Sequence, residues 1–200
     1  MRRIIKTIAP ALFIAGLLSA CAAPPPAPED AFYRLSPRAQ STVASQALLK
    51  GALEVDRFAA AGSLANRPLL FSEPGSNAVN EYHYHFWIEA PPMLLQSALV
   101  SYLRSAGVAE QVVTPAMRVR PDYTVQGRLM RLETVTGNAP QGVAEFELSL
   151  RRESDGKLLV LGEYRAEVPS GSNGVVTDAA AIEKAAGKAF AEFVADIARK

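Results

Sequence analysis

Two histidines at residues 83 and 85 are the side chains of this sequence best suited to hold a metal ion. On a regular strand, residues two apart face the same side, so His83 and His85 could bind one ion together. The further ligands nearby are Glu81 and Glu89 on the same segment, whereas zinc sites take three or four protein ligands. We therefore predict no metal site, and we interpret the pair as solvent-facing histidines opposite an apolar face formed by Tyr82, Tyr84 and Phe86.

Other motifs of catalysis or cofactor binding are missing from the sequence. It contains no Gly-rich phosphate loop followed by Lys and no dinucleotide-binding Gly pattern. The small polar segment 170–174 lacks the spacing of a nucleophile elbow and is interpreted as a loop. The 21 Lys plus Arg residues nearly balance the 20 Asp plus Glu residues, which argues against nucleic-acid binding. The sequence therefore predicts no enzyme, no cofactor and no nucleic-acid partner, and leaves a hydrolase with an unrecognised site as an alternative.

The single cysteine, Cys21, closes a segment that has the layout of a secretory signal. Basic residues (Arg2, Arg3 and Lys6) precede an apolar run over residues 8–18, which is too short for a comfortable membrane-spanning helix. The run ends in Leu18-Ser19-Ala20-Cys21, which resembles a bacterial lipobox. The resemblance implies that residues 1–20 are a lipoprotein signal peptide and that the thiol of Cys21 receives a diacylglycerol. A coincidental cysteine behind an ordinary signal peptide is the alternative.

The residues after Cys21 predict a spacer and then one domain. Residues 21–31 contain four prolines, which favour a polyproline II spacer that could reach about 30 Å. By resemblance to sorted bacterial lipoproteins, Ala22 rather than Asp after the cysteine implies an outer-membrane location facing the periplasm. From residue 32 to 200 the composition is that of a single packed domain.

Within this domain, the spacing of the apolar residues is typical of strands in some segments and of helices in others. A helix is expected from Pro91 and Pro92 to a stop at Gly107, and a last helix with Thr177 or Asp178 as its N-cap. Strands are expected at 32–35, 51–58, 68–72, 81–88, 123–134 with a bulge near Leu129 and Met130, 144–151, and 158–168 after a tight turn at 154–156. We predict an α+β fold, with a mixed, largely antiparallel sheet and two main helices packed on one face.

Aromatic side chains are concentrated just before the first helix, from Tyr82 to Trp87. Aromatic residues dominate both protein cores and protein interfaces. The cluster therefore predicts either core packing or a partner-binding patch.

Taken together, these segments resemble the PqiC-type ABC-transport auxiliary lipoproteins. The similarity begins at the Cys21 lipobox, continues through Phe32-Tyr33-Arg34-Leu35, and is strongest over residues 67–107. That region holds an Arg-hydrophobic strand, a turn, an aromatic strand ending in Trp87, and a helix that starts at prolines. The His83 and His85 pair is a departure that we do not treat as a family feature.

The resemblance implies an outer-membrane lipoprotein component of an ABC/MCE-type system that moves lipid, phospholipid above all, between membranes and maintains envelope integrity. Its partners would be an MCE-type periplasmic protein together with an ABC permease and ATPase, besides the outer-membrane bilayer reached through Cys21. A homo-oligomer is compatible with such a role. We expect Arg34, Tyr82 and Trp87 to contact the partner or to shape the surface that does. The alternative is an envelope assembly or structural lipoprotein without a transport role.

Overall fold

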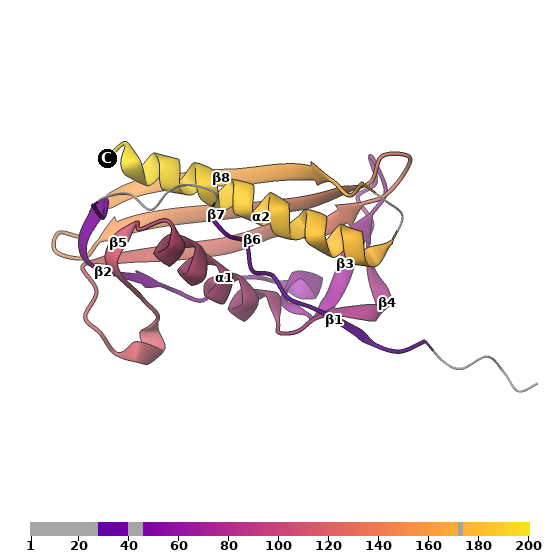
Figure 1. Ribbon diagram of the computed structural model, residues 1–200, viewed down its shortest axis with the longest axis horizontal. Helices are drawn as coiled ribbons and strands as arrows, with labels where there is room; N and C mark the ends of the chain where they lie inside the picture. The colour runs from indigo at the N-terminus through magenta and orange to yellow at the C-terminus, as the bar shows by residue number, and fades with distance from the viewer. Residues whose placement is uncertain (1–27, 40–45, 172–173) are drawn as a thin grey trace, which may run out of the picture.

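Two helices cover one face of an eight-stranded sheet, so that the domain has two layers (Figure 1). This computed structural model describes residues 28–39, 46–171 and 174–200, and both the signal peptide and Cys21 lie outside these ranges. The strands are β1 (Ala31–Tyr33), β2 (Leu49–Val55), β3 (Pro68–Ser72), β4 (Val79–Trp87), β5 (Ala109–Val113), β6 (Tyr123–Val135), β7 (Gln141–Arg152) and β8 (Leu158–Pro169). The helices are α1 (Pro91–Ser105) and α2 (Val175–Ala198), with short 3-10 turns at Gly62–Ala65 and Pro115–Met117.

The central strand of the sheet is β6, and the sheet divides into two branches along one of its edges. On its undivided edge, β6 pairs antiparallel with β7, and β7 pairs antiparallel with β8, over almost their full lengths. On the dividing edge, the first residues of β6 pair in parallel with β2, which carries β5. The last residues of β6 pair in parallel with β3, which carries β4 and then β1. An isolated bridge between Ala59 and Arg128 fills the gap between the two branches.

The long antiparallel strands match the sequence expectation closely. Strands β7 and β8 are joined by the turn around Asp155 and Gly156, and the register of β6 against β7 shifts between Leu129 and Arg131. That shift is the predicted bulge. Because the antiparallel pairs are the longest and the parallel pairs are short, the predicted mixed, largely antiparallel sheet is confirmed.

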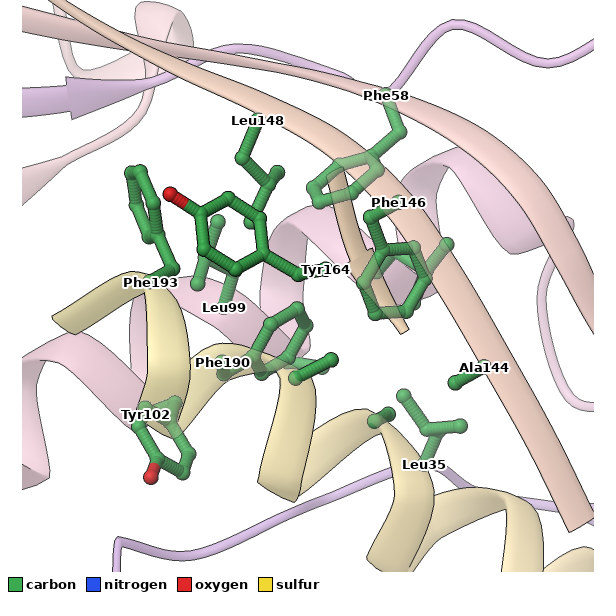
Figure 2. Packing of buried hydrophobic residues seen from close by; sticks show 14 of the residues in the cluster. Leu35, Phe58, Leu99, Tyr102, Ala144, Phe146, Leu148, Tyr164, Phe190 and Phe193 are labelled. Carbon is green, nitrogen blue, oxygen red and sulfur yellow. The ribbon is translucent and has the colours of Figure 1, made fainter. Parts of the chain in front are cut away.

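Both helices contribute to one continuous core against the sheet (Figure 2). The ring of Phe190 on α2 stacks on Phe146 of β7 at 5.3 Å between centroids, and Tyr102 of α1 meets Phe190 edge-on at 5.6 Å. Phe58 meets the other side of Phe146 at 5.8 Å. These aromatic contacts join the two helices and the sheet. Offset and edge-on ring pairs also stabilise the core beyond what the burial of their surface contributes.

Some boundaries differ from the expectation. Strand β5 was not expected, and β2 ends at Val55 rather than at residue 58. The predicted N-cap of the last helix was wrong, because α2 begins at Val175 with Gly174 in the cap position. The hydroxyl of Thr177 donates to the carbonyl of Gly174 at 2.7 Å from inside the first turn. Among the described residues, no helix is both long and apolar enough to cross a membrane.

Candidate functional site

A bulge in β4 controls how the aromatic strand presents its side chains. Pro68 of β3 pairs with Phe86, and Leu70 pairs with Glu81, so β3 advances two residues while β4 advances five. An extra residue in one strand breaks the strict alternation of faces. Consequently Tyr82 and His85 contact one another at 5.9 Å between ring centroids, although they are three residues apart.

On the helix side of the bulge, hydrogen bonds link β1, β4 and the start of α2. The hydroxyl of Tyr33 and Nδ1 of His85 share a hydrogen bond of 2.8 Å. The hydroxyl of Tyr82 donates to Oδ2 of Asp178 at 3.3 Å, and the hydroxyl of Ser170 donates to Oδ1 of the same carboxylate at 2.5 Å. The buried Asp178 lies in the first turn of α2, where a negative charge is favoured by the helix dipole.

The two tyrosines of this network remain protonated. Burial, followed by the charge of Asp178, raises the pKa of Tyr82 to about 12. The same two causes raise the pKa of Tyr33 above its ordinary value. Both hydroxyls are therefore neutral at physiological pH.

The interpretation of the histidine pair was wrong for one of its members. His83 is exposed, as expected, but His85 is half-buried and bonded to Tyr33. The bulge also places Tyr82 beside His85 rather than on the opposite face. In the part of the chain that the structure covers, no three His, Cys, Asp or Glu side chains are grouped so as to hold a metal ion.

The other side of β1 and β4 presents exposed apolar rings. Phe32 is 54% exposed and packs on Phe86 at 5.8 Å between centroids. The guanidinium of Arg67 lies 5.2 Å from the centre of the Phe32 ring, within range of a cation–π contact. Tyr84 and Ile88 are 42% and 40% exposed. We call Phe32, Tyr84, Phe86 and Ile88 the β1/β4 aromatic patch.

The three residues expected to contact a partner occupy different environments. Arg34 is exposed and borders, with Ile88, a depression of about 230 Å³ beside α1. Tyr82 is half-buried against Asp178, and Trp87 is only 1% exposed within the core. Arg34 is thus placed to touch another molecule, whereas the side chains of Tyr82 and Trp87 can act only by shaping the strand.

Phe32 and Arg67 belong to this surface although sequence reasoning did not select them. Phe32 pairs with Phe86 across 54 residues of chain, and the Nε of Arg67 donates to the carbonyl of Trp87 at 3.0 Å. The sequence analysis recognised the strand of each residue, since Phe32 belongs to the short strand after the spacer and Arg67 precedes the hydrophobic strand β3. It did not reveal that Phe32 and Arg67 would meet beside β4.

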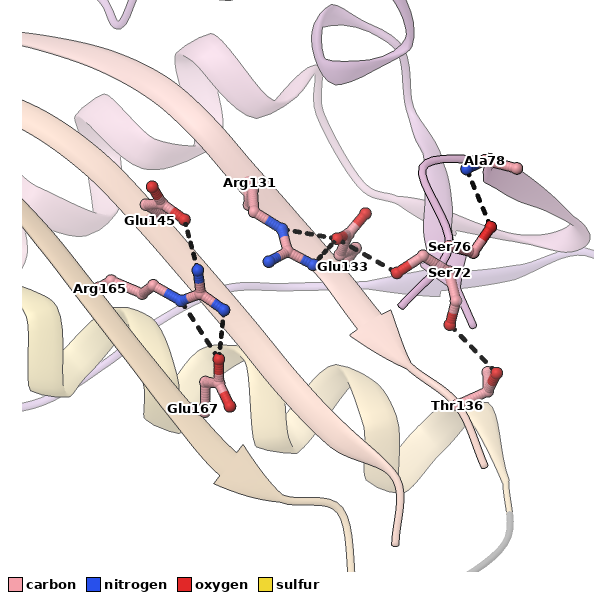
Figure 3. Close-up of polar contacts among 9 residues, drawn as sticks. All are labelled: Ser72, Ser76, Ala78, Arg131, Glu133, Thr136, Glu145, Arg165 and Glu167. Carbon is pink, nitrogen blue, oxygen red and sulfur yellow. Dashed lines mark hydrogen bonds and ion pairs between the residues drawn. The ribbon is translucent and has the colours of Figure 1, made fainter. Parts of the chain in front are cut away.

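A cavity of about 930 Å³ lies on the sheet face opposite α2, and Figure 3 shows several of the polar side chains that line it. Its floor holds Glu133, which is 3% exposed and accepts hydrogen bonds from Arg131 at 2.8 Å and from Ser72 at 3.4 Å. Beside it, Arg165 forms ion pairs with Glu145, at 3.5 Å, and with Glu167. Both arginines of the cavity are therefore neutralised by the protein's own carboxylates, and the network is a structural one.

The architecture defines a class: a two-layer α+β domain with an exposed aromatic patch on β1 and β4. The chain belongs to the family described as the ABC-type transport auxiliary lipoprotein component, whose model matches residues 33–198. The resemblance inferred from the sequence is therefore confirmed. The family is one of lipoproteins that assist transport and is not a family of enzymes.

Solved structures share the fold at low sequence identity. Protein XCC0632 from Xanthomonas campestris is 20% identical, with a TM-score of 0.71 over 82% of this chain and 92% of that one. A second, uncharacterised protein is 16% identical, with a TM-score of 0.64 over 86% of this chain and 98% of that one. None of the curated proteins matches this sequence.

Proposed function

We propose that this lipoprotein is the outer-membrane component of an ABC/MCE-type system that carries lipid, phospholipid above all, between the two membranes. The observation that supports the proposal most is the family match, which spans residues 33–198 and thus nearly the whole domain. In this role the protein is a docking or auxiliary subunit that helps to maintain the envelope. ATP hydrolysis and passage through the inner membrane belong to the ATPase and permease of the same system.

The anchoring step uses Cys21. Acyl chains on this residue hold the N-terminus in the bilayer, because each buried CH₂ contributes about 0.8 kcal/mol and two or more chains hold firmly. Residues 22–31 then let the domain reach into the periplasm. On the domain, exposed Arg34 is the proposed contact with the MCE-type partner, and Tyr82 and Trp87 shape the strand next to it.

Co-purification tests the transport role. A C-terminally tagged chain, extracted in mild detergent from its own host, should retain the MCE-type protein, the permease and the ATPase encoded beside it. Arg34→Ala should weaken that retention, while Arg38→Ala, a change of an exposed arginine four residues further on, serves as the matched control. Recovery of envelope assembly proteins without these transport chains would instead favour the structural alternative.

Two substitutions separate lipidation from sorting. Cys21→Ser should abolish the incorporation of labelled palmitate and release the protein from the membrane fraction. Ala22→Asp should leave palmitate incorporation intact but retain the protein in the inner membrane. A Cys21→Ser protein that still sediments with the outer membrane would contradict the proposed anchor.

A further inference from the structure

We propose that the β1/β4 aromatic patch rests on the surface of the bilayer to which the chain is tethered, and so sets the orientation of the domain. The inference rests on the proposed anchoring of the N-terminus and adds to it a second, non-covalent contact with the lipid. The occupant of the patch is thus the headgroup and upper acyl region of the membrane.

The chemistry of the patch suits this region. Phe32 and Tyr84 expose about half of their surfaces, and Ile88 adds an exposed aliphatic side chain. Aromatic rings concentrate where the hydrocarbon meets the headgroups, and arginine can lie there with its guanidinium in the polar layer. Arg67 suits this position, because its guanidinium lies over the ring of Phe32 and its Nε donates a hydrogen bond to the carbonyl of Trp87.

The position of the patch brings it within reach of the anchor. Phe32 follows Cys21 by only eleven residues, which can span at most about 38 Å even when fully extended. An exposed apolar side chain far from this entry point provides a comparison. Leu161, which is 62% exposed, adjoins Arg199 and Lys200 at the C-terminal end of α2, across the molecule from β1 (Figure 1).

The charges around the patch indicate contact driven by apolar burial. Exposed residues of both signs contact the patch, share a depression with it or lie within three residues of it in the sequence, namely Arg34, Arg67, Glu29, Asp30, Glu81 and Glu89. The acidic residues are the more numerous, so an anionic surface would gain no net attraction from this region. We therefore expect docking onto zwitterionic lipid, with little dependence on salt.

A fluorescence experiment tests the contact independently of lipidation. The mature chain carries Cys21→Ser and an N-terminal His tag, which attaches it to phosphatidylcholine and phosphatidylethanolamine vesicles that contain a nickel-chelating lipid. An environment-sensitive NBD dye is then placed at Tyr84→Cys or, as the matched control, at Leu161→Cys. We expect the dye at position 84 to brighten several-fold and to be quenched by lipids spin-labelled near the headgroup, and the dye at position 161 to change little.

Loss of one ring should release the patch. Phe32→Ser, a change at a half-exposed side chain, should lower the ratio of docked to undocked domains about tenfold. Equal responses at positions 84 and 161, or a response that Phe32→Ser leaves unchanged, would overturn the proposal. So would a response without vesicles that grows with protein concentration, which would assign the patch to a second copy of the chain. Because the tag replaces the acyl chains, failure of Cys21 lipidation in cells leaves this result unaffected.

Discussion

Replacing Gly142 with alanine would test how closely α2 lies on the sheet. Gly142 is near the start of β7, and a Cβ atom built on it would come within 3.0 Å of the backbone of Ala181 and Ile182 and lie 2.8 Å from the Cβ of Ala181. Real Cβ atoms essentially never show such contacts. Since the obstacle is helix backbone rather than a flexible side chain, α2 itself must move.

The expected cost follows from two opposing effects. Overpacking of a filled core costs about 1–3 kcal/mol, and we take about 3 kcal/mol here because a whole helix is displaced. Gly142 has no left-handed φ, so alanine regains about 0.5–1 kcal/mol of backbone entropy. The net loss in the free energy of unfolding is thus about 2 kcal/mol, or about 4–8 °C in Tm for a domain of this size.

The assay uses the only tryptophan as its probe. Trp87 is 1% exposed, so its emission shifts to longer wavelength when urea unfolds the domain. Gly156→Ala is the control, because Gly156 has φ +69° and no atom within 4 Å of an added Cβ. It should lose about 1 kcal/mol through backbone strain alone. A Gly142→Ala protein as stable as the unaltered chain would refute the close approach of α2 to β7.

The remaining predictions concern two polar contacts. Arg131→Ala leaves the buried carboxylate of Glu133 without its cation, and we expect urea unfolding to show a loss of about 2–3 kcal/mol, somewhat below that of a fully buried pair because Arg131 is partly exposed. The pKa of Tyr82 lies above that of an unfolded tyrosine, so its contribution to stability is constant below pH 10 and is lost as the pH rises from 10 to about 12. Tyr82→Phe, which cannot ionise, should show a shallower fall in stability over the same range.

Matched variants make both outcomes decisive. Arg128 forms an ion pair with Glu147 on the same sheet, but its side chain is exposed, so Arg128→Ala should cost less than about 1 kcal/mol. Equal losses for Arg131→Ala and Arg128→Ala would contradict the buried role of Glu133. Parallel stability curves above pH 10 for the unaltered chain and Tyr82→Phe would contradict the burial of the Tyr82 hydroxyl beside Asp178.

Several elements of the fold could be read directly from local patterns. Alternating apolar residues predicted β7 and β8 and the turn between them, and Pro91 with Pro92 predicted the start of α1. The slip in alternation near Leu129 predicted the bulge in β6. These signals are reliable because each depends on neighbours within a few residues along the chain.

The candidate surface was less predictable because it depends on one irregular pairing. Regular alternation placed Tyr82 opposite the two histidines, but the bulge in β4 turns Tyr82 and His85 toward the same side. The bulge arises where β4 pairs with β3, so its effect on β4 cannot be counted from the residues of β4 alone.

By itself, the sequence determined the lipobox resemblance, the family, the order of most elements and the α+β class. Tertiary structure decided which aromatic residues are buried, as for Trp87, and which are exposed, as for Phe32. It also decided that Phe32 and Phe86 form one surface. The physical reason is that periodicity reports which side of its own strand a residue occupies, whereas strand neighbours and bulges are set by pairings between distant segments.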